Sequence, residues 1–383
     1  MNKMDVFIVG FFLAYLIYLF IEDYQVRSYR RTFKHVIHVN GTRGKSSTSR
    51  LIAAALRAGG YRVFCKTTGT SPMTIDVDGV EEVISRRGRA NIREQIKVMK
   101  EAHRQGADLL VIECMAVEPE LQYICQNRIL RADISVVTNV RRDHLEVMGP
   151  TLKDVAKSLG KVMPKDGYFI TADERFLDYY RQLGAEHNSR VILARAREDY
   201  GIDFRDNVAI ALELASLLGI EEESAIEAIR KNYKRDPGVL AQYRLMVKED
   251  IKIDFINGFA INDPDSIKLI YKMFKERGAL DNRELILLVN NRKDRLHRFT
   301  QHIKLVGEIN PHQVWIIGDN RRMMKGRLLK SGYSLERIRI LGKDLLSHID
   351  GLSKDAVIFA IGNMGNNGLD LIKRIEEVGE KLA

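Results

Sequence analysis

Residues 38–50 read HVNGTRGKSSTSR and concentrate glycine, lysine and hydroxyl side chains in one short segment. Gly41 and Gly44 allow the backbone to turn tightly and to come close to an anion. The helix expected to begin near Lys45 directs free amide groups and the positive end of its dipole toward the same point. The lysine can reach β- and γ-phosphates, and the hydroxyl of Ser46 can bind Mg²⁺. The segment predicts a phosphate-binding loop, with a glycine-rich turn capped by serines as the alternative.

Polar side chains at two strand ends are candidates to complete a metal–phosphate site. Glu113 ends the apolar run DLLVIE, and Asn139 ends the run DISVVTN, whose following loop holds Asp143 and His144. In an open parallel sheet, ligands bind at the carboxyl ends of the strands, and a carboxylate is the more usual Mg²⁺ ligand. Taken singly, Glu113 would be interpreted as a salt-bridge residue and His144 as a surface histidine.

Short apolar runs alternate with helical stretches, which predicts mostly parallel sheets with helices on both faces. In the first half, strands are expected at 35–39, 61–66, 108–113 and 133–139, and helices at 45–58, 91–104, 207–218 and 222–231. A seam near Asp236-Pro237-Gly238 precedes a second set of strands, expected at 245–247, 251–256, 284–289, 314–317, 338–341 and 357–361. The fold class is therefore α/β, with two doubly wound domains.

Residues 6–21 read VFIVGFFLAYLIYLFI, an apolar run close to the roughly 20 residues that span a bilayer. Four basic residues follow within 27–34, and only Lys3 precedes it, so the positive-inside rule predicts a single-pass membrane anchor with the body in the cytoplasm. A signal peptide is one alternative, but Glu22-Asp23-Tyr24 offers no small-residue cleavage site. A buried core helix is the other.

The domain boundaries follow from these features. Residues 1–30 are expected to form the transmembrane anchor and its basic flank, 31–240 an ATP-binding domain, and 241–383 a second, Rossmann-like domain. The net charge of +10 comes without zinc-finger spacing or an aromatic-rich RNA motif, which favours a polyanion or a membrane surface over nucleic acid. Three cysteines without a C-x-x-C pair argue against a disulfide framework.

Two of these segments resemble the Mur ligase superfamily. GTRGKSS, at 41–47, is similar to its G-T-x-G-K-[ST]-[ST] loop, which is shorter than a Walker loop and accounts for the valine at position 39. TNVRRDHLEVMG, at 138–149, is similar to its T-N-x-x-x-D-H-x-[DE]-x-x-G segment.

A narrower resemblance is to the ligase subunits of poly-γ-glutamate synthases, the PgsB/CapB family, which also begin with a membrane anchor in place of the Mur substrate-recognition domain. The further segments that carry it are KTTGT (66–70), ECMAV (113–117), VMGPTL (147–152), DPG (236–238), NGFA (257–260), ND (262–263), N-x-R-x-D-R (290–295) and GN (362–363).

The resemblance implies an ATP-dependent amide ligase, in which ATP phosphorylates a carboxylate and an amine attacks the acyl phosphate. Lys45 would stabilise the transferred phosphoryl group, and Ser46, Glu113 and His144 would hold Mg²⁺. The implied nucleotide-binding residues in the first domain are Gly41, Thr42, Arg43, Gly44, Lys45, Ser46, Ser47 and Asn139.

The second domain adds residues by the same resemblance. Arg244 stands where Mur-type ligases place a phosphate-contacting arginine, and either Asp263 or Asn257 corresponds to their ribose-contacting aspartate. Related folate ligases carry a carbamylated lysine shortly after the D-H segment, but neither Lys157 nor Lys161 aligns cleanly with it.

Five residues are candidates for substrate binding. Arg292 and Arg295 follow a strand and are expected to clamp a carboxylate as bidentate donors, with a solvated charge run as the alternative. The set is Thr68, Arg292, Asp294, Arg295 and Asn363. The cluster RRGR at 86–89 is interpreted either as an attraction point for an anionic polymer or as an exposed loop.

The family further implies polymerisation of glutamate into poly-γ-glutamate for a capsule or a secreted polymer. It implies a small multi-span membrane partner of the PgsC/CapC type, with possible further subunits, and a homo-oligomer within the complex. Nucleic acid is not an expected partner. The alternatives are a Mur or folylpolyglutamate-type ligase for another carboxylate, and a nucleotide-binding regulatory subunit without ligase activity.

Overall fold

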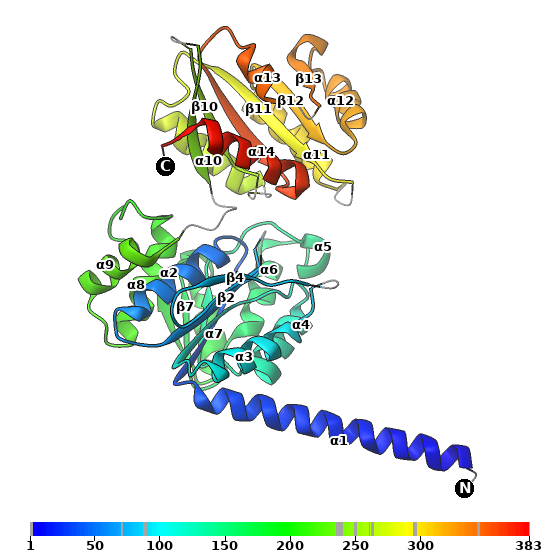
Figure 1. Ribbon diagram of the computed structural model, residues 1–383, viewed down its shortest axis with the longest axis vertical. Coiled ribbons are helices and arrows are strands. Elements are labelled where there is room, and N and C mark those ends of the chain that lie inside the picture. The colour runs from blue at the N-terminus through cyan, green and yellow to red at the C-terminus, as the bar shows by residue number, and fades with distance from the viewer. Residues whose placement is uncertain are drawn as a thin grey trace. The chain divides into compact units, whose positions relative to one another are not determined.

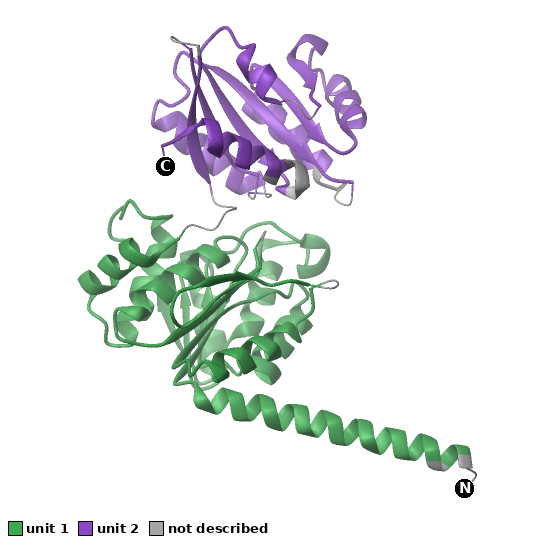
Figure 2. Ribbon diagram, in the orientation of Figure 1, with its two compact units in different colours: residues 1–236 green, residues 237–383 purple. Residues whose placement is uncertain are grey.

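The computed structural model describes residues 3–69, 72–86, 90–234, 240–248, 251–259, 261, 264–293, 297–342 and 345–382. The chain divides into two compact units, Met1–Asp236 and Pro237–Ala383 (Figures 1 and 2). Each unit is a largely parallel sheet between layers of helices, which confirms the expected α/β fold class.

The first unit is built on an eight-stranded sheet in the order β4-β3-β2-β5-β1-β6-β7-β8. Six strands are parallel, and β3 and β4 extend one edge as an antiparallel pair. The strands are β1 (His35–Asn40), β2 (Val63–Thr67), β3 (Met73–Ile75), β4 (Glu81–Val83), β5 (Leu109–Glu113), β6 (Ile134–Val137), β7 (Tyr168–Thr171) and β8 (Arg190–Leu193).

Helices cover both faces of this sheet. Successive side chains of a strand point to opposite faces, and the buried strands carry apolar side chains on both. On β1, Ile37 and Val39 pack against α2, α8 and α9, whereas Val36 packs against α3 and the end of α1. The helices are α1 (Lys3–Thr32), α2 (Lys45–Arg57), α3 (Glu94–Arg104), α4 (Pro119–Ile124), α5 (Leu145–Met148), α6 (Leu152–Leu159), α7 (Leu177–Glu186), α8 (Arg205–Leu217) and α9 (Glu222–Asn232), with a π-helix at Cys125–Leu130.

The register of the central strands brings the candidate residues to one edge. Val39 of β1 lies opposite Glu113 of β5, and Asn40 lies opposite Val137 of β6. The loop after β1 is therefore flanked by the carboxyl ends of β5 and β6, where ligands bind in open parallel sheets.

The second unit is built on a seven-stranded sheet in the order β13-β12-β11-β14-β10-β9-β15. Strands β10 to β14 run parallel, and β9 forms an antiparallel hairpin with β10. The strands are β9 (Ala241–Lys248), β10 (Ile251–Asn257), β11 (Glu284–Asn291), β12 (Gln313–Gly318), β13 (Ile338–Ile340), β14 (Ala356–Gly362) and β15 (Glu380–Lys381). The helices are α10 (Pro264–Glu276), α11 (His297–Ile309), α12 (Arg321–Lys330), α13 (Leu345–Asp350) and α14 (Gly365–Val378).

Helix α1 projects from the first unit as a long, single element (Figure 1). Within the described residues it is the one helix long and apolar enough to cross a membrane, and most of its described apolar side chains between Met4 and Ile21 are exposed. Its last turns behave differently, because Val26 is buried beside α3 and Arg30 pairs with Asp133 at 2.7 Å. The expected anchor segment 1–30 thus ends in residues that pack into the core of the first unit.

Candidate active site

The phosphate loop joins β1 to α2 through two glycines in conformations that other residues rarely adopt. Gly41 has a φ of 130° and Gly44 a φ of 80°. A Cβ on Gly41 would lie 2.1 Å from Thr138 Oγ1, so the loop is pressed against the segment that follows β6. The glycines are required here both by the backbone angle and by this close approach.

Asn139 shapes the loop through both ends of its amide. Its Oδ1 accepts a hydrogen bond from Arg43 N at 3.1 Å, and its Nδ2 donates one to Arg43 O at 3.0 Å. Thr138 Oγ1 donates to the same carbonyl at 2.6 Å, and Thr42 N donates to Asn139 O at 3.0 Å. Thr138 and Asn139, which follow β6, therefore fix the shape of the loop.

Lys45 and Ser46 occupy the first turn of α2. Lys45 Nζ donates to Gly41 O at 2.8 Å, which folds the side chain back over the loop. Ser46 Oγ donates to Glu113 Oε2 at 2.8 Å, and Thr68 N donates to the same oxygen at 2.6 Å. Ser47, the next residue, is buried.

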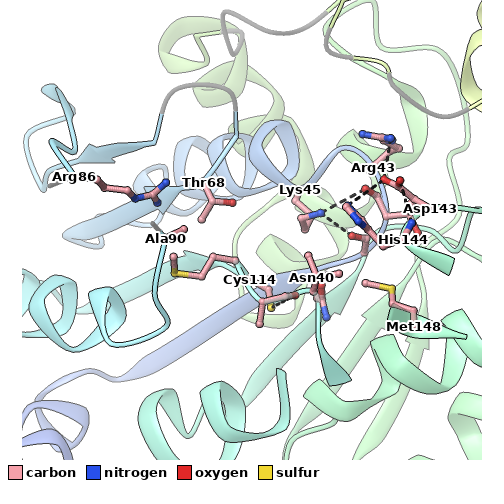
Figure 3. A pocket seen from close by; sticks show the side chains of 15 residues that line it. Asn40, Arg43, Lys45, Thr68, Arg86, Ala90, Cys114, Asp143, His144 and Met148 are labelled. Atoms are coloured by element: carbon pink, nitrogen blue, oxygen red, sulfur yellow. Dashed lines mark hydrogen bonds and ion pairs between the residues drawn. The ribbon is translucent and has the colours of Figure 1, made fainter. Parts of the chain in front are cut away.

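Arg43, Asp143 and His144 form the other flank of the site (Figure 3). Arg43 Nη2 lies 2.9 Å from Asp143 Oδ2. His144 adopts a positive φ of 49°, and its ring nitrogens lie 3.8 Å from Asp143 Oδ2 and 3.5 Å from Glu146 Oε1. The D-H segment thus supplies a carboxylate and an imidazole next to the loop.

Several of these residues, among them Arg43, Lys45 and His144, line a pocket of about 200 Å³ (Figure 3). Its lining combines the phosphate loop, the residues after β2 and β5, and the D-H segment. The lining residues are Asn40, Gly41, Thr42, Arg43, Lys45, Thr68, Arg86, Ala90, Cys114, Met115, Ala116, Val117, Asp143, His144 and Met148.

The chemistry of the donor set fits Mg²⁺ held jointly with a nucleotide. Among the described residues no group of three or more histidine, cysteine, aspartate or glutamate side chains could hold a metal ion by itself. Mg²⁺, however, is usually bound by one or two protein groups together with phosphate oxygens and water. Ser46 and Glu113 are in direct contact and offer such oxygens. His144, the third predicted ligand, lines the pocket together with Lys45, and no hydrogen bond or ion pair joins it to Ser46 or Glu113 within the part of the chain that the structure describes.

Comparison with known proteins assigns the chain to a family. The Mur ligase middle domain matches residues 39–217, and the poly-gamma-glutamate synthase CapB C-terminal domain matches residues 242–378. The capsule biosynthesis protein CapB of Bacillus anthracis is 32% identical over 397 residues, which cover 99% of this chain and 85% of that protein. The PGA synthase CapB of Bacillus subtilis (strain 168) is 33% identical over 356 residues, covering 89% and 90%.

The chain belongs to the CapB family. With its Mur ligase middle domain, this CapB-family chain is an ATP-dependent amide ligase. The resemblance predicted from the phosphate loop and the D-H segment is thereby confirmed.

Solved structures of Mur-type ligases share the fold. The folylpolyglutamate synthase of Mycobacterium tuberculosis complexed with ADP and AMPPCP has a TM-score of 0.66 and 13% identity, covering 92% of this chain and 94% of that one. MurF from Acinetobacter baumannii has a TM-score of 0.64 and 12% identity, covering 93% and 79%. At these identities the likeness concerns the fold alone.

The second unit of the CapB-family chain holds Arg244 in an internal ion cluster. Arg244 Nε and Nη2 lie 2.8 and 3.1 Å from the two carboxylate oxygens of Asp254, to which Arg283 also donates at 2.6 Å. Burial of Asp254 opposes its ionisation, but the two guanidinium groups lower its pKa. The predicted contact of Arg244 with a phosphate stays a prediction.

The remaining predicted residues of the second unit lie at the carboxyl ends of its strands. Asn257 is buried at the end of β10, where its Oδ1 accepts from Phe259 N at 3.3 Å. Asn363 follows β14, and its carbonyl accepts from Asn290 Nδ2 at 2.6 Å. Arg292 is exposed after β11. Asp263, Asp294 and Arg295 lie outside the described residues.

The lysines considered for carbamylation are both exposed. Lys157 lies on α6, and Lys161 lies in the turn that follows it. Neither lysine lines the pocket, so neither position supports a carbamylated lysine at this site.

The sequence did not predict that Lys66 and Arg86 pair with one carboxylate beside the pocket. Of the RRGR cluster, only Arg86 is among the described residues, and residues 87–89 lie outside them. Lys66 is fully buried on β2 and forms an ion pair with Glu94, which also binds Arg86. A lysine inside the fully buried strand VFCKT was the available signal, because a buried charge is rare unless it is paired.

Proposed function

We propose that the chain polymerises glutamate into poly-γ-glutamate as the catalytic subunit of a membrane synthase complex. The observation that carries this proposal is the contact of Ser46 with Glu113 beside Lys45, in a chain whose two units match Mur ligase and CapB domains. In this reaction the γ-carboxylate of one glutamate attacks the γ-phosphate of ATP, and ADP leaves. The α-amine of another glutamate attacks the acyl phosphate, loses a proton and displaces phosphate, forming the amide.

The residues of the first unit suit the first of these steps. The backbone amide groups at the start of α2 can donate hydrogen bonds to a bound anion. Lys45 adds one positive charge, and its side chain folds back over the phosphate loop. Lys45 would exchange the carbonyl of Gly41 for phosphate oxygens, neutralising charge on the transferred group. Ser46, Glu113 and His144 would hold Mg²⁺, which supplies further charge neutralisation when bound.

Helix α1 supports the membrane part of the proposal. Its exposed apolar length and the basic residues within 27–34 suit one membrane crossing with the catalytic body in the cytoplasm. The exposed apolar surface of this helix would also suit packing against a small multi-span membrane subunit, with a homo-oligomer and further subunits completing the complex. Such a placement would keep the growing polymer next to a route through the membrane.

A ligase for another carboxylate is the second candidate. The shared fold with a folylpolyglutamate synthase and with MurF favours it, because proteins with those other names have the same architecture. The long apolar helix α1 and the match to the CapB C-terminal domain favour glutamate polymerisation.

The test supplies ATP, Mg²⁺ and glutamate to the purified membrane complex and measures both ADP release and γ-linked polymer by mass spectrometry. We expect glutamate-dependent ADP release that disappears in Lys45→Ala. Lys231→Ala, which removes an exposed lysine at the end of α9, is the matched control and keeps the activity. ADP release that requires a different acid would overturn the glutamate assignment, and ADP release without γ-linked product would overturn polymerisation.

A further inference from the structure

Three charged residues form a connected cluster at the side of the pocket that Arg86 lines. Lys66 Nζ lies 3.0 Å from Glu94 Oε1. Arg86 binds the same carboxylate with two hydrogen bonds, from Nε to Oε2 at 2.6 Å and from Nη2 to Oε1 at 2.8 Å. Lys66 Nζ also lies 3.6 Å from Met115 Sδ. The cluster therefore joins β2, α3 and the segment before α3.

Fold stability alone does not account for this cluster. Lys66 is fully buried, and its pKa is lowered by burial, although the nearby Glu94 partly offsets the effect. Replacing buried ion pairs by apolar residues of similar size is often neutral or stabilising. A methionine at position 66 would fill a similar volume without a charge. The charges of Lys66, Glu94 and Arg86 therefore suggest a role in ligand binding as well as in packing.

The cluster carries a net positive charge and one side chain that reaches the pocket. Two cationic side chains share one carboxylate, so with Lys66 protonated the three side chains sum to one positive charge. Arg86 lines the pocket that also contains Lys45 and Thr68, and it lies on the side away from Arg43 and His144 (Figure 3). Glu94 takes up Nε and Nη2 of Arg86, and Nη1 has no partner among the residues that the structure describes.

We propose that Arg86 binds the α-carboxylate of the glutamate whose γ-carboxylate is activated at Lys45. This inference rests on the proposed function, and it names the part of the substrate that the pocket recognises. Glutamate carries two carboxylates on a short carbon chain, and the pocket has cationic groups at two separate places. One carboxylate reacts at the phosphate loop, so the other needs a second cation. A pocket of about 200 Å³ suits a small ligand of this kind.

Glu94 and Lys66 act as positioning residues through Arg86. The bidentate contact with Glu94 fixes the plane of the Arg86 guanidinium. The edge of the guanidinium that carries Nη1 can then donate hydrogen bonds to a second carboxylate. Lys66 supplies the extra charge that keeps the cluster attractive to an anion, since Arg86 and Glu94 alone would sum to zero. Burial raises the pKa of Glu94, but hydrogen bonds from Arg86 and Lys66 outweigh this and hold it at about 2, so the carboxylate stays ionised.

The test compares two donors that differ only at the α-carboxylate. Glutamate and isoglutamine, which carries an α-carboxamide, are each supplied with ATP, Mg²⁺ and hydroxylamine to the purified membrane complex. Hydroxylamine attacks the acyl phosphate and releases phosphate, so the γ-hydroxamate reports activation of the donor without an acceptor glutamate. We expect the unmodified chain to prefer glutamate on the order of 100-fold in kcat/KM, because a site built for a charged group rejects the amide.

In Arg86→Ala this preference is expected to fall below about tenfold, with the loss confined to glutamate. Lys66→Met is expected to reduce the preference in part. Arg104→Ala is the matched control, because Arg104 makes the same bidentate contact with Glu101, at 3.0 and 2.7 Å, on the surface of α3. The Kd for ATP, measured on each variant, is expected to be unchanged and shows that the phosphate loop is folded.

The outcomes separate the two proposals. Equal loss of activity with both donors in Arg86→Ala would assign Arg86 a structural role and overturn this inference, leaving the proposed function in place. Hydroxamate formation at the same rate from glutamate and isoglutamine in the unmodified chain would also overturn it. If the unmodified complex forms no hydroxamate from glutamate while still binding ATP, both proposals fall together.

Discussion

Ser46 and Glu113 meet at the carboxyl edge of the first sheet, where Ser46 Oγ donates a hydrogen bond to Glu113 Oε2 at 2.8 Å. Ser46 lies in the first turn of α2, and Glu113 is the last residue of β5. The same carboxylate oxygen accepts from Thr68 N at 2.6 Å, so one buried group ties the phosphate loop to the segment after β2. A cation bound to the Glu113 carboxylate would therefore lie next to the hydroxyl of Ser46.

Glu113→Gln removes the negative charge and leaves an amide oxygen that still accepts one hydrogen bond. We expect the Mg²⁺ concentration for half-maximal ADP release to rise roughly 10- to 100-fold, the usual effect of disturbing a metal ligand or its support. The measurement is a Mg²⁺ titration of ADP release at saturating ATP. Glu82→Gln, at an exposed position on β4, is the control and leaves the titration unchanged. An unaltered titration in Glu113→Gln would remove Glu113 from the metal site.

Gly41→Ala and Gly60→Ala separate backbone strain from steric conflict. Both glycines have a positive φ, 130° and 74°, but a Cβ at Gly60 meets nothing within 4 Å, whereas at Gly41 it meets Thr138. We expect Gly60→Ala to lower the free energy of unfolding by about 1 kcal/mol and to leave the Kd for ATP unchanged. Gly41→Ala has to displace Thr138, and we expect ATP binding to weaken at least about tenfold.

Equilibrium denaturation and ATP titration of the two variants check this pair. Equal ATP affinities in Gly41→Ala and Gly60→Ala would show that the loop does not need its close approach to Thr138, contrary to the geometry.

The phosphate loop was predictable because its signals are local. A strand was expected at 35–39 and a helix at 45–58, and the structure has them at His35–Asn40 and Lys45–Arg57. Gly44, in the left-handed conformation at the helix start, marks the junction in the sequence itself. Burial on both faces of the parallel strands gave the apolar runs that identified them.

Pairings between distant residues were not predictable from one sequence. Lys66 and Glu94 meet only because β2 and α3 pack together, and no local pattern links them. Arg244 and Asp254 face each other through the register of the β9–β10 hairpin, which contains an irregularity near Ile251. The strands β3 and β4 also escaped prediction, because three residues each are too few for an alternation to be recognised.

Acid should destabilise the first unit through His38. The pKa of His38 is lowered to about 4, mainly by burial; a hydrogen bond to Gln126 opposes the shift, and the charge of Lys66 adds to it. The unfolded chain binds a proton at this residue below pH 6.5, but the folded chain does so only below about 4. The unfolded state therefore gains protons in this window, and the free energy of unfolding falls as the pH is lowered from 6.5 to 4, by up to roughly 3 kcal/mol.

Denaturant unfolding of the full chain in detergent at several pH values measures this effect. In His38→Gln we expect the decline between pH 6.5 and 4 to become shallower, because the group that takes up the proton is gone. His103→Gln, on the surface of α3, is the control. A His38→Gln variant with the same decline as the unmodified chain would assign the acid sensitivity to other groups.

The end of α1 should contribute to the stability of the first unit, whereas its exposed apolar part should not. Val26 is 3% exposed, and Arg30 donates to Asp133 Oδ1 at 2.7 Å and to Arg131 O at 2.9 Å. Removing residues 1–21 leaves these contacts intact, and we expect a chain that binds ATP with unchanged affinity. Removing residues 1–32 deletes them, and we expect the free energy of unfolding to fall by roughly 3 kcal/mol or more.

A pair of point variants in the full chain gives the same test without truncation. Arg30→Ala removes the partly buried ion pair with Asp133, and Arg27→Ala removes an exposed pair with Asp23 on the same helix. We expect Arg30→Ala to destabilise the chain by about 2 kcal/mol and Arg27→Ala by less than about 0.5 kcal/mol, because exposed pairs contribute little. Equal effects of the two substitutions would show that α1 is attached to the first unit without packing against it, and the catalytic body would then begin at β1.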